Sequence, residues 1–252
     1  MVSVLVTGAS KGIGRVVAQE LAGRGHRVVA TARKPETLAD LPVDQRLALD
    51  VTDAGSIAAA VEEAGEVDVL VSNAAEIFYA AVEATPPSAL ARLFDLNTVG
   101  ALRVAQAVLP GMRRRGTGRL LFMSSVVGRT VLPPGGAYAA TKWALEALVE
   151  ALTIEVAPFG LEAALLEPGA VSSGALDDVT TYTLRDDPYT ALLGRNGGRE
   201  MITPQDVARA VADAVDVTPL PLRIPIGATA HAVLAARRAA PDDRPFVPGA
   251  RP

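Results

Sequence analysis

Apolar and polar positions along the chain fall into two alternating patterns. Short runs rich in Val, Leu and Ile predict strands at 2–7, 26–32, 46–51, 67–73, 118–125, 161–167 and 222–227. Alanine-rich stretches with helical spacing predict helices from about 13 to 23, at about 55–64, at about 86–115 and from Tyr138 to near Pro158. The apolar strands are typical of parallel strands covered on both faces. The alternation therefore predicts an α/β fold, a doubly wound, Rossmann-like parallel sheet of about seven strands with helices on both faces.

No repeat or linker divides this pattern, so 1–252 is predicted to form a single domain. The segment at about 172–203 is rich in Ser, Thr, Asp and Gly and has little periodicity. Such a segment is predicted to be irregular and to lie on the substrate side. The stretch from about 237 is rich in Pro and Arg and is predicted to be a loose C-terminal tail.

Composition excludes several classes of function. A net charge of −4 provides no basic field for nucleic acid. The absence of cysteine excludes disulfides and thiolate catalysis, and two histidines argue against a histidine-rich metal site and a Ser-His-Asp triad. No apolar run approaches bilayer length, and no positive charge precedes the apolar N-terminus as it would in a signal peptide. We expect a cytoplasmic protein with no bound metal and no membrane or nucleic-acid partner.

A glycine-rich loop, TGASKGIG at 7–14, follows the first predicted strand and opens the first helix. Gly8, Gly12 and Gly14 let the backbone turn tightly and approach a pyrophosphate, which the helix N-terminus then attracts. A plain tight turn is the alternative interpretation, because a glycine motif alone is weak evidence. Its place directly after the first strand favours a nucleotide site.

The end of the second predicted strand bears on the choice of cofactor. NAD sites usually carry a carboxylate there, which binds the ribose 2′-hydroxyl. Here the sequence is TARK, with Arg33 and Lys34 and no carboxylate before Glu36, and Lys11 lies in the glycine loop. Guanidinium and ammonium groups suit a 2′-phosphate, so we predict NADP(H) in preference to NAD(H). The alternative is that these cations are solvated surface groups.

The stretch GGAYAATKWALE at 135–146 places Tyr138 and Lys142 four residues apart. That spacing puts both on one helix face, where an ordinary polar stripe is the simplest interpretation. The sharper hypothesis is a phenol whose pKa is lowered by the ammonium and by the helix N-terminus. Such a phenol would act as general acid in reduction and as general base in oxidation.

With the glycine loop and Tyr-x-x-x-Lys together, the sequence strongly resembles the short-chain dehydrogenase/reductase family, of the short single-domain type. The resemblance extends to about residue 227. Further segments that resemble the family are LDV (49–51), SNAA (72–75), LNTVG (96–100), FMSSVVG (122–128) and EPGAV (167–171). Ser72 and Ala75 depart from the family's N-N-A-G pattern. The family's serine lies thirteen residues before the tyrosine, which selects Ser125 over Ser124.

The resemblance implies a set of site residues. The catalytic ones are Asn97, Ser125, Tyr138 and Lys142. The cofactor-binding ones are Gly8, Ser10, Lys11, Gly12, Ile13, Gly14, Arg33, Asp50, Val51, Asn73, Ala74, Tyr138, Lys142, Pro168, Gly169, Val171 and Ser173. Ser125 would hydrogen-bond the substrate oxygen, Lys142 would also bind the nicotinamide ribose, and Asn97 would hold a water that relays protons to Lys142.

We therefore predict an NADP(H)-dependent oxidoreductase, a carbonyl reductase or alcohol dehydrogenase, with Tyr138 as proton donor. An epimerase or dehydratase on the same scaffold and a non-catalytic nucleotide-binding protein remain alternatives. The resemblance also implies a homodimer or homotetramer. Four aromatic residues are candidates for an apolar substrate pocket, because they follow strands or lie in the irregular segment: Phe78, Tyr79, Tyr182 and Tyr189.

Overall fold

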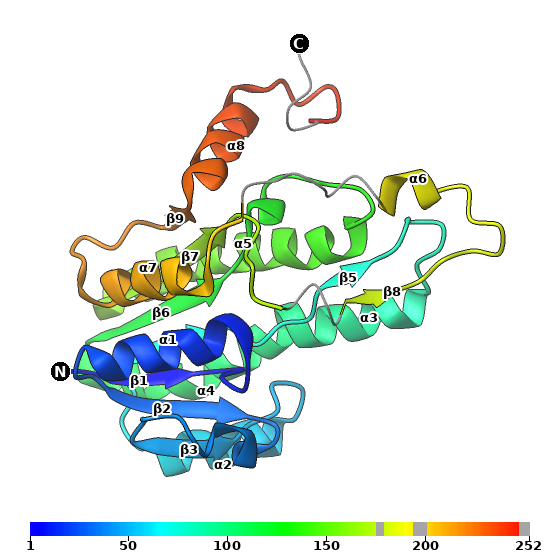
Figure 1. The fold of residues 1–252 in the computed structure, drawn as a ribbon. Helices are drawn as coiled ribbons and strands as arrows, with labels where there is room; N and C mark the ends of the chain where they lie inside the picture. The colour runs from blue at the N-terminus through cyan, green and yellow to red at the C-terminus, as the bar shows by residue number, and fades with distance from the viewer. Residues whose placement is uncertain (175–178, 194–200, 247–252) are drawn as a thin grey trace.

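The computed structural model describes residues 1–174, 179–193 and 201–246. Seven parallel strands form one sheet in the order β3-β2-β1-β4-β6-β7-β9 (Figure 1). They are β1 (Ser3–Val6), β2 (Arg27–Ala32), β3 (Gln45–Ala48), β4 (Val69–Ser72), β6 (Gly118–Met123), β7 (Leu161–Pro168) and β9 (Arg223–Ile226). The predicted doubly wound parallel sheet is confirmed, and each predicted strand end lies within about three residues of the observed one, as is usual for element boundaries.

Helices cover both faces of the sheet (Figure 1). One face packs against α1 (Gly12–Gly23) and α7 (Pro204–Asp216), and the other against α2 (Ala54–Ala64), α4 (Gly100–Arg115) and α5 (Gly136–Val156). Successive strand residues point to opposite faces, so neighbouring apolar positions enter different cores. Both faces must therefore be apolar, which explains the uninterrupted strand sequences.

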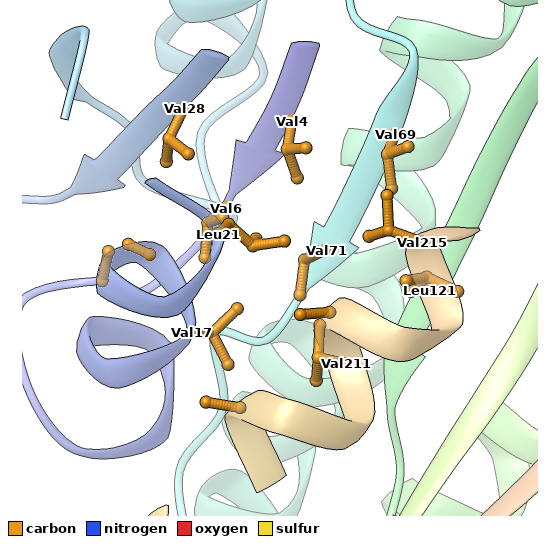
Figure 2. Close-up of a cluster of buried hydrophobic side chains, with 14 of the residues drawn as sticks. Val4, Val6, Val17, Leu21, Val28, Val69, Val71, Leu121, Val211 and Val215 are labelled. Carbon is orange, nitrogen blue, oxygen red and sulfur yellow. The ribbon is translucent and has the colours of Figure 1, made fainter. Parts of the chain in front are cut away.

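Figure 2 shows the core between the sheet and the pair α1 and α7. Val4 and Val71 from the strands pack with Val17 of α1 and Val211 of α7. Val71 and Val211 lie far from Val4 and Val17 in the sequence, so the core joins distant parts of the chain. None of these four side chains exposes any surface. Burial of each contributes roughly 1.5–3 kcal/mol to folding. This packing holds the glycine loop, which joins β1 to α1, on a rigid base.

The sheet order reverses at β1, because β2 and β3 lie on one side of it and β4 follows on the other. Ligands of doubly wound sheets bind at such a switch point, outside the carboxyl ends of the strands. The glycine loop follows β1, and Asn73 follows β4. The topology therefore brings two of the predicted motifs together.

The structure differs from the sequence-based expectations for helices and tail at three places. The helix predicted at 86–115 is divided into α3 (Pro87–Phe94), a π-helical turn at Asp95–Val99, and α4. The predicted tail from 237 begins too early, because α8 (Ala228–Ala239) includes its first residues. The sequence pattern also did not single out α7, which begins with a capping box at Thr203 and Asp206.

The segment predicted to be irregular contains short elements in its described part. β8 (Thr180–Thr181) pairs with β5 (Phe78–Tyr79) in a second, two-stranded parallel sheet, and α6 (Thr190–Leu193) follows. Its residues 175–178 and 194–200 lie outside the described residues. Among the described helices, none is long and apolar enough to cross a membrane.

Candidate active site

A cavity of about 830 Å³ lies outside the carboxyl ends of β1, β2, β4, β6 and β7. All the predicted cofactor-binding residues contribute to its wall, as do Ser125, Tyr138 and Lys142. Asn97 does not line it. The fold thus gathers nearly all the predicted site residues around one space whose size suits a small-molecule ligand.

The glycine loop is packed so tightly that two of its glycines have no room for a side chain. A Cβ at Gly14 would lie 2.4 Å from both the Gly8 carbonyl oxygen and Asn73 Nδ2, and one at Gly8 would lie 2.9 Å from Ala74 Cα. Asn73 Nδ2 donates hydrogen bonds to the carbonyl oxygens of Thr7 (3.0 Å) and Gly8 (3.3 Å). Asn73 therefore fixes the loop from the neighbouring strand.

Two cations and one carboxylate also contribute to the cavity wall, Lys11 from the glycine loop, Arg33 after β2 and Asp50 after β3. Lys11 and Arg33 are exposed and contribute to the wall. Asp50 Oδ1 accepts hydrogen bonds from the amide (2.9 Å) and the hydroxyl (2.7 Å) of Thr52. These two bonds, with a smaller contribution from Arg33, hold the pKa of Asp50 below its ordinary value. A close-packed glycine loop and cations at the end of β2 fit a nicotinamide dinucleotide.

Tyr138 and Lys142 lie on one face of α5, near its N-terminus. Lys142 Nζ donates a hydrogen bond to the carbonyl oxygen of Met123 (2.7 Å) and lies 5.8 Å from the centroid of the Tyr138 ring. Burial lowers the pKa of Lys142 to about 8, and the charge of Glu146 opposes that change. The ammonium is therefore poised to titrate near neutral pH.

The predicted lowering of the Tyr138 pKa is wrong for this structure. Burial raises the pKa of the phenol above its ordinary value, and Tyr79 adds to the rise. The physical reason is that desolvation disfavours the phenolate, while the nearby ammonium donates to Met123 rather than to the phenol. The predicted spacing of tyrosine and lysine is observed, but its effect on the pKa is not.

The two candidate serines differ in their contacts. Ser124 is buried, and its hydroxyl donates to Glu146 Oε1 at 2.5 Å. Ser125 is partly buried, and its hydroxyl has a long contact of 3.5 Å to the Pro168 carbonyl oxygen and accepts from the Val127 amide at 3.3 Å. Because Ser124 already donates its proton, Ser125 is the better placed of the two for a substrate oxygen.

Asn97 lies in the π-helical turn, behind the cavity wall, and is buried. Its Oδ1 accepts from the amide of Glu76 (2.8 Å), and its Nδ2 donates to the Glu76 carbonyl oxygen (2.9 Å) and to Thr141 Oγ1 (3.2 Å). Single π-helical turns occur frequently at functional sites. The side chain of Asn97 thus ties the loop after β4 to α5, and its predicted role in a water relay stays a prediction.

Sequence reasoning missed several residues that organise the site. Glu76 pairs with Arg92 (2.7 Å) and accepts from Thr180 Oγ1 (2.8 Å), which joins the small sheet to α3. Thr7 Oγ1 accepts from the amides of Asn73 (2.9 Å) and Ala74. These contacts join positions far apart in the chain, and no local pattern indicates them.

The remaining wall of the cavity is largely apolar. Its apolar side chains include Ile77, Tyr79, Val126, Val127, Leu132, Met201 and Val233, while Arg92, Ser124 and Thr229 add polar groups. Of the four aromatic candidates, only Tyr79 contributes to this wall. Phe78 is fully buried beneath Tyr182, with ring centroids 5.4 Å apart, and Tyr189 donates its hydroxyl to Glu83 at the surface. In the described part of the chain, no cluster of three or more His, Cys, Asp or Glu residues is placed to hold a metal.

Comparison with known proteins identifies the family. The sequence profile described as short chain dehydrogenase matches residues 3–182, which contain the glycine loop, Ser125, Tyr138 and Lys142. The chain belongs to the short-chain dehydrogenase/reductase family. The predicted resemblance is confirmed, and the chain is an oxidoreductase of that family with a nucleotide-binding Rossmann fold.

The alignments with known relatives cover most of this chain. Human retinol dehydrogenase 8 is 36% identical over 88% of this chain and 80% of its own. A short-chain dehydrogenase from Streptomyces avermitilis is 36% identical, with a TM-score of 0.86 over 94% of this chain and 92% of its own. A short chain dehydrogenase from Burkholderia cenocepacia, solved in complex with NADP, is 25% identical, with a TM-score of 0.81 over 94% of this chain and 93% of its own.

Proposed function

We propose that the protein is an NADP(H)-dependent oxidoreductase that interconverts a carbonyl compound and a secondary alcohol. The observation that carries this proposal is the convergence of Ser125, Tyr138 and Lys142 on the cavity that also holds the glycine loop. A purely binding protein needs the loop but has no use for a partly buried phenol and a buried ammonium beside it. The convergence therefore favours catalysis over nucleotide binding alone.

Each site residue has a separate role in the proposed hydride and proton transfer. The nicotinamide, when bound, supplies or accepts the hydride. In reduction, Tyr138 donates its proton to the carbonyl oxygen as negative charge develops there, and in oxidation it takes the proton back. Ser125 donates a hydrogen bond to the same oxygen. Lys142 stabilises the phenolate that remains, which matters because burial by itself raises the pKa of Tyr138.

The preference for NADP(H) is supported by cations at the end of β2 and in the glycine loop. Arg33 and Lys11 both line the cavity and are exposed, and no carboxylate follows β2 before Glu36. The relative from Burkholderia cenocepacia was solved with NADP. The ratio of kcat/KM with NADPH to that with NADH tests this preference, and a higher value with NADH would contradict it.

The substrate is proposed to be an apolar carbonyl or alcohol, because the wall beyond Ser125 and Tyr138 consists mainly of aliphatic side chains. A relative carries the name of a retinol dehydrogenase, which fits a hydrophobic substrate. The decisive experiment is a panel of ketones and secondary alcohols of graded polarity, assayed with NADPH or NADP⁺ by absorbance. Turnover of none of them, with NADPH still bound, would favour the non-catalytic alternative.

Assembly as a homodimer or homotetramer is also proposed. On α5, Trp143 (41%), Leu148 (42%) and Ile154 (74%) expose apolar side chains. Exposed apolar groups along one helix often mark a contact between subunits. Light scattering coupled to size-exclusion chromatography measures the mass directly, and a monomer would contradict this part of the proposal.

A further inference from the structure

Glu146 lies on the same helix as Tyr138 and Lys142, one turn after Lys142. Only 4% of its side chain is exposed. No step of the proposed chemistry uses it. Because a buried carboxylate is costly unless it is paired, its partners reveal what it does.

Both carboxylate oxygens of Glu146 are bound. Oε1 accepts a hydrogen bond from Ser124 Oγ (2.5 Å), and Oε2 accepts one from Arg223 Nε (2.9 Å). Arg223 lies on β9 and also donates through Nη2 to Glu150 Oε2 (2.6 Å). One carboxylate thus joins α5, the end of β6 and β9.

Lys142 and Glu146 hold consecutive residues of the segment that leads to Ser125. Lys142 binds the carbonyl of Met123, and Glu146 binds the side chain of Ser124. Gly128, in the 3₁₀ turn that follows Ser125, packs directly on this contact, since a Cβ there would lie 2.7 Å from Ser124 Oγ and 3.0 Å from Glu146 Oε1. The backbone around Ser125 is therefore fixed from both sides.

The charged groups of this region form a network around the buried Lys142, Glu146 and Glu167. Its titratable and charged members come from several elements: Tyr79, Tyr138, Lys142, Glu146, Glu150, Glu167, Arg129, Arg223 and Arg238. Glu146 is the group whose charge favours the protonated form of Lys142, against the effect of burial. Burial and the repulsion of Glu146 raise the pKa of Glu167 to about 7, so Glu167 carries little charge below neutral pH. Glu146 is then the principal buried counter-charge for Lys142.

We propose that Glu146 is a positioning residue for proton transfer by Tyr138 and Lys142, an inference that rests on the proposed function. Its carboxylate, oriented by Arg223, holds Ser124 in place and so fixes the segment that carries Ser125. The same carboxylate supplies the counter-charge that keeps the buried ammonium of Lys142 protonated. Glu146 acts through these two residues and does not contact the reacting atoms.

The chain offers a direct readout, because it contains only three lysines, Lys11, Lys34 and Lys142. In protein labelled with carbon-13 at the lysine ε-carbon, the buried Lys142 is distinguished from two exposed lysines by its titration. In Glu146→Gln, the Lys142 midpoint is expected to fall by about one unit or more, since an opposite charge is removed. In Glu150→Gln, which removes an exposed partner of the same arginine, the midpoint is expected to stay in place.

Turnover provides the second readout. Glu146→Gln is expected to lower kcat by about tenfold or more at pH 8, with its pH profile displaced to lower pH and with NADPH affinity preserved. Glu146→Asp, which keeps the charge, is expected to restore the pH profile. In a Glu167→Gln background the displacement should persist, which assigns it to Lys142.

An unchanged Lys142 titration in folded Glu146→Gln overturns the proposal. If Glu146→Gln does not fold, Ser124→Ala tests the positioning contact: lower kcat with an unchanged Lys142 midpoint supports it, and wild-type kcat overturns it. Wild-type protein that binds NADPH but turns over no carbonyl contradicts the proposed function instead. In that case the titration still decides whether Glu146 controls the charge of Lys142.

Discussion

At the scale of single residues, the chemistry depends on how burial and charge oppose each other. Burial disfavours the phenolate of Tyr138 and the ammonium of Lys142, so it raises one pKa and lowers the other. Bringing two such groups together makes each charged form more favourable when the other is also charged. The pair therefore works as a unit, and removing either member should affect the function of both.

Replacement of Tyr138 by phenylalanine removes the proposed proton donor and leaves the ring in place. Turnover is expected to fall by at least about 100-fold, because general acid catalysis contributes this much or more. NADPH affinity, measured by fluorescence quenching, should be preserved. Tyr189→Phe is the matched control, since that phenol donates to Glu83 and lies outside the cavity wall. Near-normal turnover in Tyr138→Phe would refute the assignment.

The cofactor preference is tested by comparing two adjacent cations. Arg33 contributes to the cavity wall, whereas Lys34 is also exposed but does not. Arg33→Ala is expected to lower kcat/KM with NADPH by about 10- to 100-fold, as loss of a charge-assisted hydrogen bond costs about 1.5–3 kcal/mol. Activity with NADH should change little, and Lys34→Ala should leave both cofactors unaffected. Equal losses with both cofactors in Arg33→Ala would count against a 2′-phosphate contact.

At the scale of elements, the site is assembled where strands end. The glycine loop follows β1, Arg33 follows β2, Asn73 follows β4, and Ser125 follows β6. Each loop is held by contacts from another element, such as Asn73 on the glycine loop and Asn97 on the loop after β4. The positions of functional side chains therefore depend on packing between elements more than on the conformation of any one loop.

Two glycines of α1, Gly14 beside the glycine loop and Gly23 at the end of the helix, test whether the loop has room for a side chain. Gly14→Ala places a methyl group 2.4 Å from the Gly8 carbonyl oxygen, so it is expected to lower the free energy of unfolding by about 1–3 kcal/mol or more and to weaken NADPH binding. Gly23→Ala has no neighbour within 4 Å of the new methyl group and should be neutral or slightly stabilising. Urea unfolding and NADPH titration measure both effects. Equal stability of the two variants would contradict the close packing of the loop.

At the scale of the whole molecule, a buried acidic group makes stability depend on pH. Glu167 has 1% of its surface exposed, and burial raises its pKa from 4.5 to about 7. A group whose pKa is higher in the folded state destabilises the fold increasingly as pH rises from about 4.5 to about 7. The loss is fully present above pH 7.

Glu167→Gln removes this ionisation while it keeps the shape of the neutral acid. Relative to wild type, the variant is expected to gain stability between pH 4.5 and pH 7, by on the order of 1–3 kcal/mol, and to keep that gain at pH 8. Urea unfolding at several pH values measures the difference. Glu155→Gln, at an exposed position of α5, should show no such trend. A constant difference between Glu167→Gln and wild type across this range would rule out the titration.

The sequence by itself determined the strands, the order of motifs and the spacing of Tyr138 and Lys142. These features are local, because each depends on a short stretch of chain. They are the strand and helix periodicities, the glycine loop and the four-residue spacing of Tyr138 and Lys142. The family resemblance extended this to Ser125 and Asn97, and the cavity wall contains every predicted cofactor residue.

Only the tertiary structure decided which groups control those side chains. Glu146 and Arg223 are 77 residues apart, and no sequence pattern indicates their contact. The predicted fall in the pKa of Tyr138 failed because desolvation depends on everything that packs around the phenol. Asn97, in the π-helical turn, likewise accepts a hydrogen bond from the amide of Glu76, 21 residues away, which no local pattern indicates. Periodicity fixes elements, whereas burial and long-range pairing set the charges on which the proposed reaction depends.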